Sequence, residues 1–441
     1  MNKTNWLKQE LGKWVGQRLI SAEQAEKISA LYPASLSSKN IASALFSILG
    51  AVCLGLGVIL LFAYNWDQLG RLARTIISFA PVVISGALGF WVLHKHPDSL
   101  GKREAVGALF FLSIGATMAL ISQTYHVSDD YNTFILTWML VGFPLMYFFN
   151  AGVPLICYLA GITYWIGDCQ NQGGHALFYW PLFLLAFPKV REVFHQSGEG
   201  TSASLSTSLR KIWVGWAIAI TQTVALGVSL EKSVPGLWMV IYAFYFGTLE
   251  WVGRRYFSSA ESFWQNPLNR FGRFGILILA YLLTFDWPWR ETGFLSFRDG
   301  GRYHGWAAIG DAVLFVFFGF WALRSWAESL KAKQEELSLL GFFPFLIALI
   351  FALNSVMPGF VMLELVFNLT LLTYGIFCVL SGWRQDSLKL VNGGLAVIMI
   401  VLVTRFGDES WGILTRAIIF MVLGAGFLIL NGAFNRKRVK L

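Results

Sequence analysis

Long apolar segments constrain this chain more than any other feature of its sequence. Fourteen stretches of mostly apolar residues, each about 13–24 residues long, fill nearly all of its 441 positions. A bilayer core about 30 Å thick needs about 20 apolar residues in a helix, and lipid offers no partners for unpaired backbone groups. We therefore expect an all-α, polytopic integral membrane bundle of about fourteen transmembrane helices.

The expected spans are separated by polar loops and differ in length. Three of them, at 151–166, 176–188 and 271–285, are short for a bilayer, so a re-entrant or broken helix there would change the total. The full set is roughly residues 42–64, 72–93, 105–124, 131–149, 151–166, 176–188, 212–230, 235–252, 271–285, 306–326, 339–357, 360–382, 388–404 and 414–434.

Basic residues are concentrated in alternate loops. If the loop after the first span is external, the large majority of the 34 lysine and arginine residues lie in the even-numbered loops and at the two ends of the chain. The positive-inside rule then predicts that both termini are cytoplasmic, here in a bacterial inner membrane. Because the net charge of +9 is spread over span ends rather than gathered on one face, it does not indicate nucleic-acid binding. Charged residues make up only 13% of the chain, too few to coat a soluble domain.

The segment before the first span differs from the rest of the chain. Residues 1–40 are predicted to form a cytoplasmic amphipathic segment of two short helices, the second of which begins at a capping box of Ser21 and Gln24. This segment either docks on the membrane or the bundle, or binds a cytoplasmic protein partner. We expect the first span to be retained as an anchor, because no cleavable signal precedes it.

A serine- and glycine-rich stretch divides the spans into two sets. We predict a first bundle part of about six helices at 41–195, a flexible cytoplasmic linker at 196–209, and a second bundle part of about eight helices at 210–441. A linker at this position would allow the two parts to rock against each other.

Several short groups of residues resemble those of a known family. They are Leu11, Trp14, Gly16 and Ile20; then Ala63-Tyr64-Asn65-Trp66-Asp67; then Gln123-Thr124-Tyr125-His126; and the closing hairpin from Arg416 to Asn431. On these residues the chain resembles the uncharacterised bacterial family of polytopic membrane proteins catalogued as domain of unknown function 2157. The resemblance implies a membrane location and a helical architecture over the whole chain, and it implies no biochemical activity.

The densest polar group follows the third span, on the predicted external face. Ionisable side chains are costly within a bilayer, which makes such groups default candidates for a substrate or ion pathway. Histidine and aspartate also change charge when a proton or cation binds. The alternative is a solvated turn in which one of the two aspartates caps the fourth span. The candidates are Gln123, Tyr125, His126, Asp129 and Asp130.

A second candidate group lies near the outer ends of later spans. Glu364 and Asn368 are four residues apart, so they share one helix face about one turn inside the external end. We predict that they line a substrate or ion pathway; the alternative is that Glu364 only complements the helix N-terminus after Pro358. Asp311 is a further pathway candidate at an outer span end, and Glu250 lies near an inner one.

Two external hairpins each carry an acid followed seven or eight residues later by an arginine. We predict that Asp67 with Arg74, and Asp408 with Arg416, form structural ion pairs that lock these hairpins. The likeness of the hairpins indicates either an internal duplication or convergence. The alternative role for the external arginines, which include Arg405, is anion binding.

The sequence contains no enzymatic motif of the common kinds. It has no phosphate-binding loop, no HExxH, no GxSxG and no spaced cysteine and histidine set, so we predict neither a metal nor a cofactor and favour a non-enzyme. The leading hypothesis is a transporter- or flippase-like protein for a small molecule or a lipid-linked substrate, driven by an ion gradient or a partner.

Two alternatives remain beside that hypothesis. One is a non-transporting scaffold or sensor whose residues 1–40 bind a cytoplasmic partner. The other is a membrane-embedded enzyme on a lipid-linked substrate, in which Asp129 and Asp130 hold a divalent ion. The lipid bilayer is a partner in all three.

Overall fold

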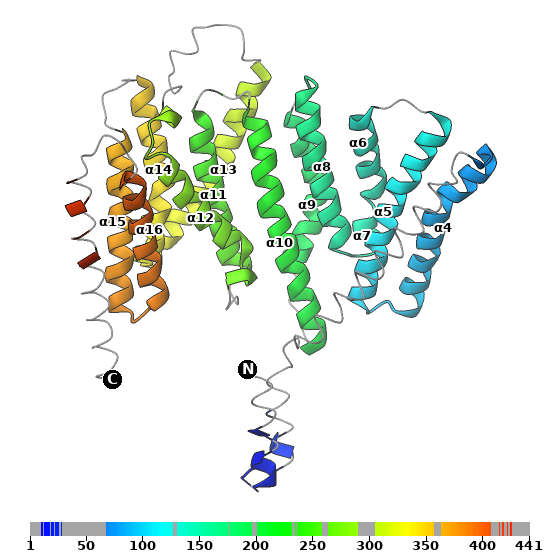
Figure 1. Ribbon diagram of the computed structural model, residues 1–441, viewed down its shortest axis with the longest axis horizontal. Coiled ribbons are helices and arrows are strands. Elements are labelled where there is room, and N and C mark those ends of the chain that lie inside the picture. Colours follow the sequence, from blue (N-terminus) through cyan, green and yellow to red (C-terminus); the bar gives the residue numbers. More distant parts are fainter. Residues whose placement is uncertain are drawn as a thin grey trace. The chain divides into compact units, whose positions relative to one another are not determined.

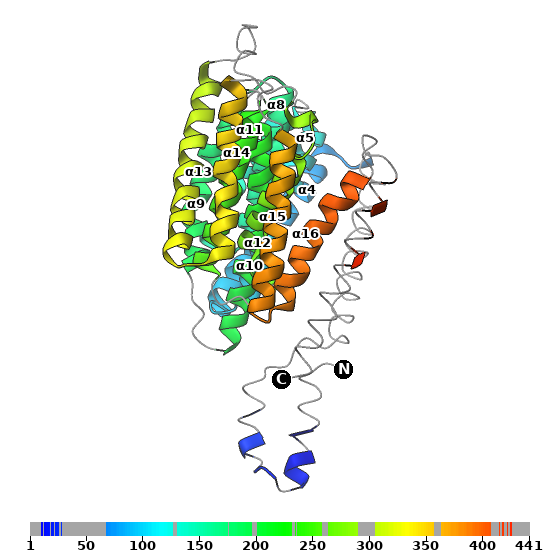
Figure 2. The ribbon, with the colours of Figure 1, turned by 90° about the vertical axis from the view of Figure 1, so that its left-hand side faces the viewer.

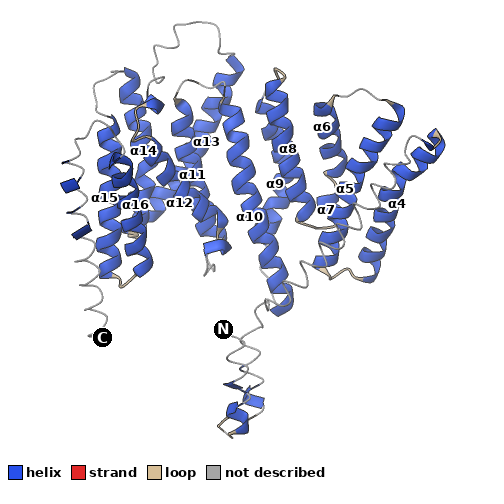
Figure 3. Ribbon diagram, viewed as in Figure 1, coloured by secondary structure: helices blue, strands red, loops and turns tan. Residues whose placement is uncertain are grey.

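Helices account for nearly all of the chain that the structure describes. The computed structural model describes residues 68–126, 130–174, 176–195, 201–231, 234, 236–257, 263–289, 305–356 and 363–406, together with isolated positions within 10–28 and 414–425. None of these residues lies in a strand, as Figure 3 shows. The all-helical fold class is therefore confirmed for the described residues.

Consecutive long helices alternate in direction (Figure 1). In chain order they are α4 (Arg71–Lys95), α5 (Leu100–Tyr125), α6 (Tyr131–Gly142), α7 (Leu145–Phe148), α8 (Val153–Asn171), η2 (Ala176–Phe178), α9 (Tyr179–His195), α10 (Thr201–Leu230), α11 (Leu237–Tyr256), η3 (Phe263–Gln265), α12 (Pro267–Leu282), η4 (Trp287–Trp289), α13 (Gly305–Lys331), α14 (Glu335–Val356), α15 (Leu363–Arg384) and α16 (Leu388–Phe406).

Eight helical segments among the described residues are long and apolar enough to cross a membrane. They are Arg71–Lys95, Leu100–Tyr125, Tyr131–Phe148, Thr207–Leu230, Ile309–Lys331, Glu335–Val356, Leu363–Arg384 and Leu388–Arg405. The expected span at 42–64 lies outside the described residues, and the span at 414–434 is described only at isolated positions. Several apolar helices are thus established, and the total of fourteen stays a prediction.

The remaining long helices, α8, α9, α11 and α12, are either shorter or more polar, and α11 is the most enclosed of them. Most residues of α11 are buried, and this helix packs against α12, α13 and α14. In the same way α8 packs against α5, α6 and α10. A helix surrounded by protein does not need to be apolar toward lipid, which explains why these interior helices carry more polar and aromatic side chains.

The chain divides into two compact units, residues 1–77 and 78–441. In the first unit, the Ser21 hydroxyl accepts a hydrogen bond from the backbone of Gln24 over 3.1 Å, and the Gln24 side chain accepts one from the backbone of Ser21 over 2.9 Å. These two bonds confirm the predicted capping box. Helical positions described before it end at Gly16.

In the second unit, one continuous apolar core runs from Phe111 on α5 to Val401 on α16. Its largest fully buried members include Tyr158, Tyr179 and Phe343. Large apolar side chains also cover the outside of the helices, for example Val83, Phe90, Leu112, Ile220, Val316, Phe320 and Leu369. An apolar exterior around a core that also holds polar groups is the arrangement expected for a bundle in lipid.

One predicted boundary requires correction. α10 begins at Thr201, so residues 201–209 are helical, although their serine-rich sequence predicts part of a flexible linker at 196–209. Serine and threonine cost only about 0.5 kcal/mol per residue in a helix relative to alanine, and the apolar run that follows supplies the helix nucleus. α8, from the first predicted bundle part, packs directly against α10, which continues into the second part. The division into two bundle parts stays a prediction.

Candidate functional site: buried polar networks in the bundle

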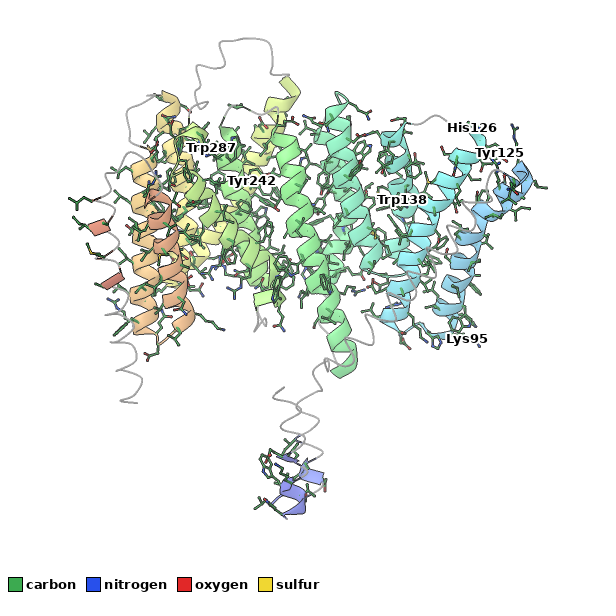
Figure 4. All side chains as sticks on the ribbon, viewed as in Figure 1. Lys95, Tyr125, His126, Trp138, Tyr242 and Trp287 are labelled. Carbon is green, nitrogen blue, oxygen red and sulfur yellow. The ribbon has the colours of Figure 1, made fainter. Side chains whose placement is uncertain are left out.

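The two ends of the second unit are named here after residues labelled in Figure 4. Lys95 lies at one end, and His126 lies at the opposite end of α5. By chain order, the Lys95 end contains the last turns of α9, α11 and α13 and the first turns of α10, α12 and α14. Two buried polar networks lie along these helices, and two acid–base pairs flank one of the networks.

The Glu250 network lies at the Lys95 end and consists of Glu250, Arg254, Asn269 and Ser325. Glu250 is buried, with only 5% of the residue exposed. It accepts hydrogen bonds from Arg254 Nε at 2.9–3.0 Å, from Asn269 Nδ2 at 3.0 Å and from Ser325 Oγ at 3.3 Å. Arg254 in turn donates to Ser325 Oγ over 2.8 Å. One carboxylate therefore joins α11 to both α12 and α13.

Glycines allow α11 and α12 to cross closely enough to form this network. A Cβ placed on Gly272 would lie 2.5 Å from both Glu250 N and Phe246 O, and one on Gly253 would lie 2.2 Å from Asn269 N. Small residues at helix crossings let backbones approach in this way. The glycine contacts therefore set the distance between Glu250 and Asn269.

Asn266 fixes the start of α12 against the end of α11. Its side-chain oxygen accepts a hydrogen bond from Asn269 N over 3.2 Å, which caps α12. Its amide nitrogen donates to the carbonyls of Gly253 at 3.1 Å and Phe257 at 3.3 Å. Both helix ends are satisfied by one residue, so Asn269 is held in place toward Glu250.

Two further acid–base pairs flank the Glu250 network. Arg273 on α12 forms an ion pair with Glu336 on α14, and the Tyr374 hydroxyl on α15 donates to Glu336 over 3.5 Å. On the other side, Glu328 on α13 accepts hydrogen bonds from Trp251 Nε1 at 2.7 Å and Arg324 Nε at 3.1 Å. The side chain of Glu328 is 43% exposed, so this second pair lies at the edge of the bundle.

A neutral network occupies the half of the bundle toward the His126 end, and Figure 4 labels one of its members, Tyr242. Gln222 Nε2 donates to the buried Tyr179 hydroxyl over 2.6 Å. The Tyr242 hydroxyl donates to the Thr223 carbonyl over 2.8 Å, and the hydroxyls of Thr223 and Tyr245 lie 3.1 Å apart. We call these five residues the Gln222 network. It joins α9, α10 and α11.

The external group predicted after α5 is exposed where the structure describes it. Gln123, Tyr125 and His126 are exposed, and His126 ends α5 with a φ of 49° while its backbone N–H donates to the Ser122 carbonyl. Asp129 lies outside the described residues. The pathway role of this group stays a prediction.

Asp130 caps α6, as the alternative predicted. Its carboxylate accepts hydrogen bonds from the backbone of Asn132 at 3.2 Å and of Thr133 at 3.3 Å, and from the Thr133 hydroxyl. The hydrogen bond from the Thr133 side chain lowers the pKa of Asp130 below its usual value. Both carboxylate oxygens are engaged in the cap. Among the described residues no group of three or more His, Cys, Asp or Glu side chains is placed to hold a metal ion.

The second predicted group contacts an arginine. Asn368 Oδ1 accepts a hydrogen bond from Arg405 Nε over 3.2 Å, and Asn368 Nδ2 donates to the Glu364 carbonyl over 2.6 Å. Arg405 also donates to the Thr284 carbonyl at the end of α12. The Glu364 side chain is half-buried on the same helix face. The structure thus joins α12, α15 and α16 at the His126 end. α15 and α16 pack against each other, come together toward the Lys95 end and diverge toward the His126 end (Figure 2).

The structure describes Asp311, but it does not describe both members of either predicted hairpin ion pair. Asp311 is 5% exposed and accepts a hydrogen bond from Val234 N over 3.3 Å, which ties α13 to the loop between α10 and α11. Arg74 Nε donates to the Leu69 carbonyl over 3.0 Å. Its predicted partner Asp67 and the pair Asp408 and Arg416 lie outside the described residues, so both ion pairs stay predictions.

Asn269, Ser325 and Glu336 were not identified from the sequence. Ser325 and Glu336 lie 75 and 86 residues after Glu250 and on other helices, so no local spacing connects them to it. The one available signal was Asn269, which lies four residues before Arg273 at the start of an apolar helix.

The helical fold, the apolar exterior and the buried polar networks together define a multi-helix membrane protein. Within it, residues 12–155 match the family described as predicted membrane protein (DUF2157). This match confirms the resemblance over those residues; the likeness of the closing hairpin from Arg416 to Asn431 lies beyond them and stays a prediction. No curated protein and no solved structure matches the chain significantly.

Proposed function

We propose that the protein is a transporter- or flippase-like membrane protein driven by an ion gradient, with Glu250 as the carboxylate that couples ion movement to a conformational change. The observation that carries this proposal is the burial of Glu250 among hydrogen-bond donors from three helices. Ionisable groups inside a membrane bundle are costly, and in pumps and transporters they mark ion pathways.

Protonation of Glu250 supplies a physical basis for two states. The ionised carboxylate attracts Arg254 and accepts hydrogen bonds from Asn269 and Ser325, which draws α11, α12 and α13 together. A protonated carboxyl loses the attraction to Arg254 and has one fewer acceptor position. Proton binding would therefore weaken the contacts between the three helices, and a conformation with these helices apart would bind the proton more tightly.

The Gln222 network supports the same proposal from the other half of the bundle. It provides neutral hydroxyl and amide groups between α9, α10 and α11. α11 contributes to both networks, with Tyr242 and Tyr245 in its first half and Glu250 in its second half. A substrate with hydroxyl or phosphate groups would exchange hydrogen bonds with such groups without the cost of desolvating a charge.

Proton flux in proteoliposomes tests the proposal. The full-length protein is reconstituted with potassium inside, valinomycin sets an inside-negative potential, and an enclosed pH-sensitive dye reports proton entry. We expect flux above that of protein-free liposomes, loss of this flux in Glu250→Gln, and wild-type flux in Glu328→Gln, the matched change at the bundle edge. Wild-type flux no greater than that of protein-free liposomes would contradict the proposal, as would wild-type flux in Glu250→Gln.

The scaffold or sensor hypothesis is a second candidate function, favoured by the N-terminal segment. The capping box at Ser21 and Gln24 and the buried side chain of Leu11 support ordered helices there, which a partner-binding role needs. Under this hypothesis, deletion of residues 2–38 removes the protein's cellular phenotype, and Glu250→Gln retains it. The opposite pattern would favour transport.

A further inference from the structure

A tight turn between α7 and α8 is held by charged side chains from three other helices at the Lys95 end. Glu104 on α5 accepts hydrogen bonds from the backbone N–H groups of Gly152 at 2.8 Å and Val153 at 2.7 Å. A carboxylate at this position complements the positive end of the α8 dipole. Both oxygens of Glu104 are therefore engaged in capping α8.

Two buried cations hold the other side of the same turn. Lys189 on α9 is 1% exposed and donates to Asn150 Oδ1 and, over 2.8 Å, to Glu192. Arg210 on α10 is 8% exposed and donates to the Asn150 carbonyl over 3.0 Å. Asn150 has a φ of 45°, a left-handed conformation that asparagine tolerates better than most residues. The two cations therefore hold both the side-chain and the backbone carbonyl of Asn150.

Arg103 adds a third cation to this cluster. It is half-buried in the first turn of α5, and its Nε is buried without a hydrogen-bond partner among the described residues. Its charge lies within Coulombic range of both Lys189 and Arg210. The cluster of Arg103, Lys189 and Arg210 thus faces two carboxylates, Glu104 and Glu192. The first already caps α8, and the second accepts from Lys189.

We propose that Arg103, with Lys189 and Arg210 behind it, binds an anionic phosphate group at the Lys95 end of the bundle. An unpartnered guanidinium donor next to two further cations is costly unless an anion compensates it. Guanidinium groups match the geometry of phosphate oxygens, and basic clusters between membrane helices bind lipid headgroups. The phosphate belongs either to an anionic lipid or to a small soluble molecule. This inference does not depend on the proposed function.

Two anionic probes and one zwitterionic control lipid test the site. They also distinguish a lipid headgroup from a soluble phosphate as the bound anion. Full-length protein in detergent is titrated with phosphatidylglycerol, with phosphatidylcholine and with inorganic phosphate, and retained lipid is counted by native mass spectrometry while thermal unfolding is followed. The variants are Arg103→Gln, Arg103→Lys and Lys102→Gln. Lys102 is exposed and lies next to Arg103, so its replacement removes the same charge from the same segment.

We expect phosphatidylglycerol to be retained and to stabilise the wild type more than phosphatidylcholine does. Arg103→Gln should weaken this binding at least about tenfold, the effect of losing one charge-assisted hydrogen bond, while Lys102→Gln stays within about twofold. Arg103→Lys should recover only part of the affinity, because lysine lacks the planar fork. Stabilisation by inorganic phosphate with the same dependence on Arg103 would support a soluble source. If wild type and Arg103→Gln bind phosphatidylglycerol equally and also bind inorganic phosphate equally, the proposal is overturned.

Discussion

Asn269 donates a hydrogen bond from Nδ2 to Oε1 of Glu250 over 3.0 Å, and this bond joins the first turns of α12 to the most enclosed helix of the bundle. The two residues are only 19 positions apart in the chain, yet they meet across a helix crossing that Gly253 and Gly272 make possible. The position of the buried carboxylate therefore depends on backbone packing as much as on its charged partner.

Removal of the Glu250 carboxylate should destabilise the bundle. Glu250→Ala leaves Arg254 without its acid, and because Arg254 is 24% exposed we expect a loss at the lower end for a buried pair, about 3 kcal/mol. Glu250→Gln keeps an acceptor for Asn269 and should lose only about 1–2 kcal/mol. Unfolding in mixed micelles with increasing SDS measures both. The control Glu328→Gln should lose less than about 1 kcal/mol, and an equal loss in Glu250→Ala would contradict this prediction.

Because α11 and α12 cross at Gly253 and Gly272, we expect one added methyl group there to lower the free energy of unfolding markedly. In Gly272→Ala the new Cβ would lie 2.5 Å from backbone atoms of Glu250 and Phe246, which cannot move independently. We expect a loss of at least about 2 kcal/mol in the same unfolding assay. Gly393→Ala on α16 is the matched control, since a Cβ there meets nothing within 4 Å, and it should be neutral or stabilising by up to about 1 kcal/mol. Similar stabilities for the two variants would show that α11 and α12 are not in close contact.

The cap at Asp130 predicts a pH dependence confined to the start of α6. The pKa of Asp130 is lowered in the folded state. The ionised carboxylate therefore stabilises the cap fully above the unfolded-state pKa, and this stabilisation is lost as the pH falls through the lower folded-state pKa. Hydrogen exchange at the amides of Asn132 and Thr133, corrected for intrinsic rates, measures this. We expect faster exchange in Asp130→Ala at neutral pH and little change in Asp130→Asn. Unchanged exchange in Asp130→Ala would show that the cap is not formed.

Asn368 and Glu364 should behave differently although they share a helix face. Asn368→Ala removes an acceptor from Arg405 and should lose about 1–2 kcal/mol of unfolding free energy, measured as for Glu250. Glu364→Gln should change this free energy by less than about 1 kcal/mol, because the side chain is only half-buried.

The Glu364→Gln variant also distinguishes the two candidate coupling groups, Glu250 on α11 and Glu364 on α15. The proposed role of Glu250 predicts that this variant retains wild-type proton flux. Loss of flux in Glu364→Gln together with normal flux in Glu250→Gln would instead place the coupling group on α15, within the pathway that the sequence predicts at Glu364 and Asn368.

The sequence predicted the helices well because continuous apolar runs in lipid have few alternatives. The weak predicted spans at 151–166 and 176–188 correspond to α8 and α9, which extend to Asn171 and His195. Both helices continue past the apolar run because polar residues near the membrane surface still form helical hydrogen bonds. The same effect moved the start of α10 to Thr201, inside the segment predicted as a linker.

The candidate site was less accessible to sequence reasoning. Glu250 was recognisable as an acid at the end of an apolar run, but its partner Ser325 lies 75 residues later on another helix. The exposed group at Gln123 and His126 was predicted as a pathway because its polar residues lie close together in the sequence. Adjacency of polar residues is common in solvated turns, whereas burial of a charge depends on packing between helices that one sequence does not reveal.

We propose that these helices span a bilayer and that their Lys95 end, which holds Glu250 and the Arg273–Glu336 ion pair, faces the cytoplasm. Single cysteines in place of His126 and Lys95, in a background without the native cysteines, can be labelled with a membrane-impermeant maleimide in intact and permeabilised bacterial cells. We predict labelling at position 126 in intact cells and at position 95 only after permeabilisation. Equal labelling of both positions in intact cells, or labelling of position 95 alone, would contradict the account.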